Sequence, residues 1–393
     1  MLYKRYEALI SAPHTARRNS MKKKILFGSL LFLCLCAGCS GEKVEKQSGE
    51  QKKAPNDRQA QLWEYEFPKE YVKQTGNTSF ETEIVVDNQS GKNIFFQGSA
   101  TLQKINPEIL KEEIFKETSQ AAEEHTINST NYIGEEEELK IWQTPSGETL
   151  YYSSVNTSYT SPLFMHINQA FTLPETAAED AGYSTTEEFE GFTRDHAYQK
   201  LAEILEKSGI HLPKEYICYT LPAALMAERE YVEDMEGNED VSGKKKDWDS
   251  GDDTYYFVFQ SRYCGLPSYH PFAYQITKDS LENSPVQAAV ARDGLAYLSI
   301  ERVFDYKQEE KTLRLKTFDE IAEALETQFS NVLGTANYKV KRAELKAMEK
   351  MTGKDSYTMT PVWVIHIETE DEDGVRQFQK ILDGETAREI ILS

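Results

Sequence analysis

The sequence predicts an α+β fold, with helices packed on antiparallel sheets and the folded part arranged as two similar domains. Two segments with helical periodicity, 194–208 and 318–333, are each followed by a strand, a hairpin and a second strand. This order of helix and antiparallel hairpin favours α+β over a doubly wound parallel sheet. The length of 393 residues also fits roughly two domains of ~150 residues each.

The first part of the folded region reads as strands around one helix. Asn106 can cap this helix and Pro107 suits its first position, with an apolar stripe following on one face. The glutamate run at 135–138 reads as a solvated loop. The expected strands, rich in β-branched and aromatic residues, are 78–86, 94–102, 139–142 and 150–159.

The two later helices carry start and stop signals. The 194–208 segment has its apolar residues on one face and is followed by a glycine. In the 318–333 segment, Thr317 and Glu320 form a capping box, and Gly334 follows the last apolar residue.

The segments after these two helices are similar, at a separation of about 120 residues, and we read this as an internal duplication. The first copy has expected strand and hairpin segments at 216–218, 223–225 and 255–259, with a long polar loop. The second has them at 338–340, 343–345 and 362–367, with a turn at 352–355. The predicted units are an N-terminal α+β domain at 63–192, a first helix–hairpin module at 193–316 and a second one at 317–393.

Residues 21–39 have the order of a secretory signal. Three lysines follow Met21, an uninterrupted apolar run covers 25–35, and small residues precede Cys39. The apolar run is shorter than the ~20 residues that a membrane-spanning helix needs. Since Met21 makes a better start for this signal than the first residue, residues 1–20 are read as dispensable.

The end of this signal, Cys36-Ala37-Gly38-Cys39, resembles the lipobox of bacterial lipoproteins. That family usually has Leu three residues before the modified cysteine, whereas here Cys36 holds that place and Leu35 precedes it. The alternatives are an uncleaved apolar anchor or a plain secretory signal.

The resemblance implies cleavage between Gly38 and Cys39 and a thioether-linked diacylglycerol, such as one carrying palmitate, on Cys39. Because each buried CH2 contributes ~0.8 kcal/mol, two acyl chains suffice for stable anchoring. The expected location is the outer face of the cytoplasmic membrane of a Gram-positive bacterium. Residues 39–62, which are charged and without apolar periodicity, then form a flexible tether.

The charge distribution argues against nucleic acid as a partner. Of the 44 basic and 65 acidic residues, the first 38 residues hold seven and one, so the remainder has a net charge of −27. A surface this acidic is repelled by nucleic acid and by anionic headgroups. The same charge also simply favours solubility.

Two cysteines remain once the signal has been removed and Cys39 has been lipidated. Outside the membrane a disulfide between Cys218 and Cys264 is permitted. Each of these residues lies in an apolar, strand-like stretch, which suits two buried free thiols equally well.

The C-terminal region carries a second resemblance. The strand 357–364, which contains Pro-Val-Trp, looks like a strand of PepSY-like domains and of the extracytoplasmic Yyc-type proteins that restrain a sensor kinase. The turn at 381–386 is similar to their terminal turn, although the usual Asn-Ala before it is absent. The resemblance covers about 317–393 and, more loosely, 254–303. As a whole, the chain resembles uncharacterised lipoproteins of Gram-positive anaerobes.

Four aspartates around Gly251 form a candidate calcium site: Asp247, Asp249, Asp252 and Asp253. Hard oxygen ligands at alternating positions could hold Ca²⁺. The twelfth position from Asp247, where a helix–loop–helix calcium loop has Glu, is Val258. A hydrated hairpin loop is therefore the alternative interpretation.

The sequence contains no nucleophile elbow, zinc-protease motif, phosphate loop or dinucleotide fingerprint, so we assign no catalytic residue and no cofactor. Ser242 and Lys245 satisfy S-x-x-K, but they lie in the long polar loop and chance explains the match. Six histidines come after the signal at scattered positions, and we expect His366 to face away from the apolar residues beside it. The tyrosine pairs at 151–152 and 255–256 could line a carbohydrate or peptide groove, or belong to the sheet core.

These observations favour a membrane-tethered, non-enzymatic binding or regulatory module, with a membrane protein or envelope component as partner. The first alternative is a cell-envelope hydrolase, which a cluster of perturbed titratable groups in a shared cleft would favour. The second is a solute-binding lipoprotein of a transporter, which needs two lobes with repeated βα units.

Overall fold

The computed structural model describes residues 64–391, apart from 117–120, 131–135, 154–155, 173–181, 271–283, 333–335, 354–355 and 372–373. By its internal contacts the chain divides into Met1–Asp57 and Arg58–Ser393, and the second unit contains all the described residues. It is mostly β with few helices, and antiparallel sheets are present as predicted.

One sheet, sheet A, combines strands from the two ends of the described chain. Along the main path the order is β1-β2-β15-β16-β3-β14, and β17 also pairs with β16. All pairs are antiparallel except β2 with β15. The strands are β1 (Glu70–Thr75), β2 (Thr78–Val85), β3 (Phe96–Leu102), β14 (Phe304–Thr312), β15 (Asn337–Gly353), β16 (Ser356–Asp371) and β17 (Gly374–Asp383).

The other large sheet, sheet B, is antiparallel throughout, with the order β4-β5-β6-β7-β13-β12-β9-β8. Strands β4 to β7 form one antiparallel half, strands β8, β9, β12 and β13 form the other, and β7 pairs with β13 between them. The strands are β4 (Glu123–Thr130), β5 (Glu136–Gln143), β6 (Thr149–Tyr152), β7 (Thr157–Thr160), β8 (Glu215–Leu221), β9 (Thr254–Gln260), β12 (Val286–Ala291) and β13 (Gly294–Ile300). Two short strands, β10 (Arg262–Tyr263) and β11 (Leu266–Pro267), form a separate pair.

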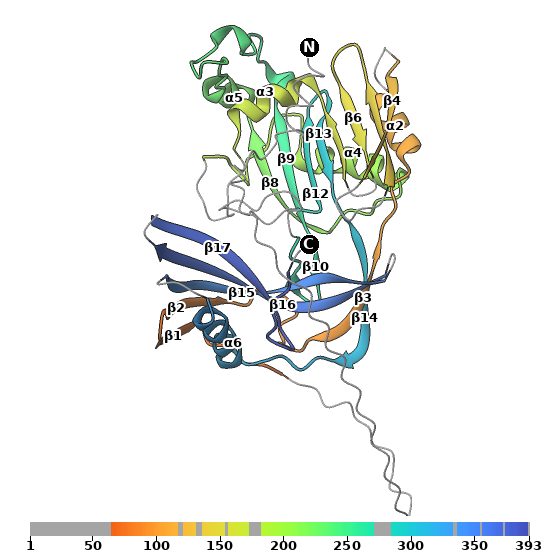
Figure 1. Ribbon diagram of the computed structural model, residues 1–393. Helices are drawn as coiled ribbons and strands as arrows, with labels where there is room; N and C mark the ends of the chain where they lie inside the picture. The colour runs from red at the N-terminus through yellow and green to blue at the C-terminus, as the bar shows by residue number, and fades with distance from the viewer. Residues whose placement is uncertain are drawn as a thin grey trace, which may run out of the picture. The chain divides into compact units, whose positions relative to one another are not determined.

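Helices cover both faces of sheet B and one face of sheet A (Figure 1). The helices are α2 (Pro107–Phe115), α3 (Pro162–Ala170), α4 (Arg194–Lys207), α5 (Ala223–Arg229) and α6 (Phe318–Ser330). Apolar residues of α2 and α4 share a core with one face of sheet B, and those of α3 and α5 share a core with the other. Helix α6 packs on sheet A, where its Phe318 ring meets the Trp363 ring edge-on at 5.3 Å.

The predicted helix starts are confirmed because each has a local physical cause. Asn106 accepts hydrogen bonds from the backbone of Glu108 and Ile109, and Pro107 occupies the first turn of α2. Thr317 and Glu320 form the predicted capping box of α6.

Several strand and loop predictions were wrong in detail. The segment 223–225 belongs to helix α5 rather than to a hairpin arm, and β8 pairs directly with β9. The segments 338–340 and 343–345 are parts of one strand, β15, which is irregular between Val340 and Arg342. Glutamates 136–138 lie on β5 rather than in a loop. Of the turn expected at 352–355, residues 352 and 353 belong to β15, and 354–355 lie outside the described residues.

The two sheets do not follow the predicted boundaries at 192/193 and 316/317. Strand β2 pairs with β15, and β3 pairs with β16, so N-terminal strands complete a sheet that is built largely from C-terminal ones. The 63–192 segment therefore contributes to both sheets. The physical reason is that strand pairing uses backbone groups that every residue carries, so the alternation of side chains does not reveal the partner strand.

Arg262, whose side chain is 12% exposed, connects sheet A and sheet B through two ion pairs. Its guanidinium lies 2.6 Å from Asp87, which follows β2, and 2.6 Å from Glu215, which opens β8. The same side chain donates to the carbonyl oxygens of Asp87 and Gly265. An arginine fork satisfies several acceptors at once, which suits it to fixing one sheet against the other.

Candidate functional site

The predicted lipid attachment residue Cys39, together with Gly38, lies outside the described residues. Its modification therefore stays a prediction from the sequence. Within the part of the chain that the structure describes, no helix is long and apolar enough to cross a membrane.

The aspartate cluster does not form the expected calcium site, because the carboxylates stabilise the loop separately. Asp249 accepts from the backbone of Gly251 and caps a short 3-10 turn, Ser250–Asp252. Asp252 pairs with Lys245 at 3.0 Å, and Asp253 pairs with Arg292 at 3.4 Å. Asp247 is exposed, and its carbonyl oxygen accepts from the Lys245 ammonium group. Across the described ranges, no group of three acidic, histidine or cysteine side chains could hold a metal ion.

The disulfide that the sequence permitted is absent, because Cys218 and Cys264 are both free. Cys218 lies on β8 in the core between sheet B and α4, and its burial raises the pKa of the thiol to about 12. Cys264 lies in the turn between β10 and β11, against the core of sheet A. The two thiols belong to different cores, and burial raises the pKa of both, which lowers their reactivity.

A buried carboxylate, Glu230, organises the long loop between α5 and β9. Its side chain is 1% exposed, directly after helix α5. It receives the backbone N–H of Lys245, at 3.1 Å from each carboxylate oxygen, and the Trp248 indole N–H at 3.0 Å. The His166 Nδ1 atom lies 2.7 Å from a carboxylate oxygen of Glu230. Because its hydrogen bonds are made in full, this burial is tolerated.

The contacts of Ser242 and Lys245 show that their match to the S-x-x-K motif is a chance one. The Ser242 hydroxyl donates to Asp240 at 2.6 Å, whereas the Lys245 ammonium group contacts the carbonyl of Asp247 and the carboxylate of Asp252. The two side chains therefore have separate partners, and each fixes a turn of the loop.

Residues 231–241 form a small hairpin that projects from this loop base; we call it the 231–241 hairpin. Asp240 donates its backbone N–H to the Val232 carbonyl, and the backbones of Glu233 and Glu239 form an antiparallel β-bridge. Asp234 accepts the backbone N–H groups of Glu236 and Asn238 at the turn, which lowers the Asp234 pKa. Figure 1 shows the loop beyond α3 and α5, at one end of sheet B.

A second polar cluster lies on the face of sheet A opposite α6. The Glu344 carboxylate, 13% exposed, lies 2.6 Å from the Lys346 ammonium group and also pairs with the Arg342 guanidinium. Arg342 reaches Glu83 on β2 at 2.9 Å. Burial alone would raise the Glu344 pKa, but the two cations outweigh it and the pKa is lowered.

His366 belongs to this second cluster. It faces away from Ile365 and Ile367, which are buried against α6, as the sequence predicted. Burial lowers the pKa of the imidazole, and Lys346 and Arg342 add to this effect while Glu344 opposes it. The Nε2 atom lies 3.8 Å from the Glu344 carboxylate and makes no hydrogen bond. At neutral pH this histidine is therefore a neutral group beside an ion pair.

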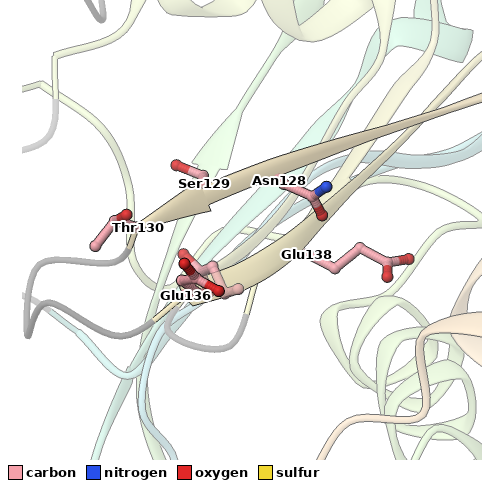
Figure 2. Close-up of a pocket in the computed structure, with 6 residues that line it drawn as sticks. Asn128, Ser129, Thr130, Glu136 and Glu138 are labelled. Carbon is pink, nitrogen blue, oxygen red and sulfur yellow. The ribbon is translucent and has the colours of Figure 1, made fainter.

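Figure 2 shows a hollow at the outer end of the β4–β5 hairpin. Its lining is entirely polar, which differs from the mostly apolar lining of small-molecule pockets. The lining of the hollow therefore gives no reason to assign a small-molecule site there. The lining residues are Asn128, Ser129, Thr130, Glu136, Glu137 and Glu138.

The tyrosine pair at 255–256 belongs to the sheet core. Tyr255 and Tyr256 are at most 5% exposed, on opposite faces of β9. Tyr255 donates from its hydroxyl group to the Phe192 carbonyl at 3.0 Å. These rings therefore cannot line an open groove.

Sequence reasoning missed the pairing of His166 with Glu230. The two residues lie 64 positions apart and meet only because α3 and α5 pack together. Nothing local marks Glu230, which comes after the apolar residues of a short helix like any surface acid. The signal that could have pointed to this region is the unusual length of the loop after it.

Comparison with known proteins gives a fold and no activity. No family model matches the chain, and no curated protein matches it. Among solved structures, an uncharacterised protein from Eubacterium rectale is similar, with a TM-score of 0.52 and 13% sequence identity. The similarity covers 83% of this chain and 94% of that one. At this identity the likeness shows the fold alone.

Proposed function

We propose that the protein is a lipid-anchored, extracytoplasmic binding or regulatory module without catalytic activity. The observation that carries the proposal is the order of basic residues, apolar run and lipobox-like segment ending at Cys39. The binding role is supported by a long surface loop that is held in one conformation by Glu230 instead of being left free. Ordered loops on a rigid scaffold commonly carry recognition.

The proposed lipid modification of Cys39 is tested by growing the source bacterium with an alkyne-tagged fatty acid. We expect the label to enter the wild-type protein, which fractionates with membranes, and to be lost in Cys39→Ala. A Cys218→Ala variant, which removes a buried thiol, serves as the matched control and should keep the label. Equal labelling of wild type and Cys39→Ala would refute the anchor.

The binding role is tested by crosslinking the anchored protein in its native membrane, with Cys39→Ala as the control. Recovery of a defined membrane protein or envelope component with the anchored form alone supports a tethered module. If neither form enriches a partner, the binding role loses its support, and the protein should then be tested for hydrolysis of cell-envelope substrates.

A cell-envelope hydrolase is the second candidate, and one observation favours it. Glu344 and His366 both have shifted pKa values and lie on the same face of sheet A. Against it, Lys346 and Arg342 hold the Glu344 carboxylate in ion pairs, which weakens it as a base. Hydrolysis of cell-envelope polymer by wild type but not by Glu344→Gln would establish the enzyme instead.

The expectation of two similar domains also remains a proposal. It is supported by two runs of helix followed by antiparallel strands, α4-β8-β9-β12 and α6-β15-β16-β17. Two separate thermal transitions, each shifted by core substitutions in one sheet alone, are the expected result. A single transition that responds equally to substitutions in both sheets would contradict it.

A further inference from the structure

We infer that the 231–241 hairpin is a docking surface for a basic, amphipathic polypeptide segment of a partner protein. This inference rests on the proposed binding function and names the partner's chemistry. Its basis is a group of exposed apolar side chains on a hairpin that is hydrogen-bonded at its base and its tip, together with the charged side chains beside them.

The hairpin carries three exposed large apolar residues. The bridge between Glu233 and Glu239 and the Asp240 N–H bound to the Val232 carbonyl set the register of the two arms, which places Tyr231 opposite Val241. Met235 lies at the turn that joins the arms. The exposed fractions are 45% for Tyr231, 98% for Met235 and 68% for Val241. Large apolar side chains gathered in this way on a surface indicate an interaction site.

Hydrogen bonds hold the hairpin at its base and at its tip. Tyr231 donates its backbone N–H to the Gln169 carbonyl at the end of α3, next to the Glu230 cluster. At the tip Asp234 closes the turn, and Asp240 accepts the backbone N–H of Ser242 at 2.9 Å. A surface already ordered before binding loses less conformational entropy when a partner arrives. Met235 is therefore presented to solvent at the tip of a fixed turn.

The charge around these apolar residues identifies the partner as basic. Glu233 and Glu239 form the bridged pair next to Tyr231 and Val241 along the two arms, and Glu236 follows Met235 at the turn. Lys244 pairs with Glu239, and the acids still outnumber it. An acidic rim around apolar anchors complements a segment that carries Lys or Arg beside large apolar residues.

The test uses residues 58–393, a compact unit that contains every described residue. The probe is a fluorescein-labelled amphipathic helical peptide of Lys and Leu, and its binding is followed by fluorescence anisotropy. The comparison probe has the same lysines with Ser in place of Leu, so it measures general attraction to an acidic protein. We expect the Lys/Leu peptide to bind the wild-type chain more tightly than the Lys/Ser peptide.

Two sets of variants locate the binding. Tyr231→Ser, Met235→Ser and Val241→Ser combined should weaken Lys/Leu binding by about tenfold, as expected for loss of apolar anchors. The matched control, Val72→Ser with Val375→Ser, removes exposed apolar residues from sheet A and should change binding less than about twofold. Circular dichroism and thermal unfolding confirm that each variant is folded.

Charge is tested in the same way. Glu233→Gln with Glu236→Gln should weaken binding more than Glu309→Gln with Glu310→Gln, which removes the same charge from exposed positions on β14. Equal binding of the two peptides, or unchanged binding by the apolar triple variant, would overturn the docking surface. Neither result depends on lipid attachment, so the proposed anchor stands or falls separately.

Discussion

Two enclosed carboxylates, Glu230 beside sheet B and Glu344 on sheet A, are stabilised in different ways. Glu230 contacts a backbone N–H, an indole and an imidazole, which come from two segments: the loop before β9, through Lys245 and Trp248, and helix α3, through His166. Glu344 is satisfied by the cations Lys346 and Arg342 on its own strand. The first arrangement joins distant parts of the chain and fixes a loop, whereas the second balances charge along one strand.

The difference shows that the structural role of a buried carboxylate depends on the groups that it contacts. Hydrogen bonds from backbone and ring N–H groups are directional, so Glu230 sets the position of the loop. Ion pairs between neighbouring side chains on one strand place no distant segment. We therefore expect substitutions at the two sites to differ in the size and in the spatial reach of their effects.

The largest effect is expected for Glu230→Ala. The change leaves the N–H groups of Lys245 and Trp248 without their buried acceptor and opens a void, at a cost of about 3 kcal/mol of unfolding free energy. Urea denaturation measures the loss, and hydrogen exchange should show faster exchange throughout the 231–253 loop. Glu228→Ala, an exposed acid on α5, is the control and should stay within about 0.5 kcal/mol of wild type. Wild-type exchange in the loop of Glu230→Ala would contradict the anchoring role.

A smaller effect is expected for Glu344→Ala. Lys346, 7% exposed, would lose its 2.6 Å ion pair with Glu344, at a cost of about 2 kcal/mol. Glu344→Gln keeps a hydrogen-bond acceptor and should lose less. Exchange in the 231–253 loop should be unchanged in both variants, which separates this site from Glu230. Protection lost in that loop would show that the two sites are coupled.

Lowering the pH should reduce the free energy of unfolding through both His366 and Glu344, which lie on sheet A. The pKa of His366 is lowered from its ordinary value of 6.5, so below pH 6.5 the unfolded chain binds a proton that the folded chain resists. The Glu344 pKa is lowered from 4.5, so its contribution is present above 4.5 and is lost as pH falls through the folded pKa. His366→Gln should flatten the fall in stability between pH 6.5 and 4.5.

Unfolding curves recorded across this pH range measure that slope. His125→Gln, at an exposed position on the edge strand β4, should leave the slope as in wild type. A slope that is identical in wild type and His366→Gln would show that other groups dominate the acid response.

The smallest effect is expected for Arg342→Gln. The guanidinium is 42% exposed, and exposed ion pairs contribute about 0.2–1 kcal/mol each in general. We expect a loss of about 0.5 kcal/mol, which shrinks further in concentrated NaCl because salt screens exposed charges. Urea denaturation at low and high salt measures both values. A loss above about 2 kcal/mol would show that Arg342 acts as a buried partner of Glu344.

The candidate site itself could be predicted only in part. The sequence predicts the loop as a long polar segment, but the prediction that its aspartates bind Ca²⁺ is wrong. Asp249 and Asp252 satisfy nearby backbone groups, a use that competes with metal binding and leaves the same composition in the sequence. His366 was placed correctly because alternation along a strand is a local property.

The features that the sequence determined by itself are local. Helix caps at Asn106 and Thr317, the outward face of His366 and the signal-like run before Cys39 each depend on neighbouring residues alone. The tertiary structure decided which strands pair, that α5 replaces a hairpin arm, and that His166 meets Glu230. These outcomes depend on backbone hydrogen bonds and packing between distant segments, whose free energies are summed over the whole fold and leave no mark at one position.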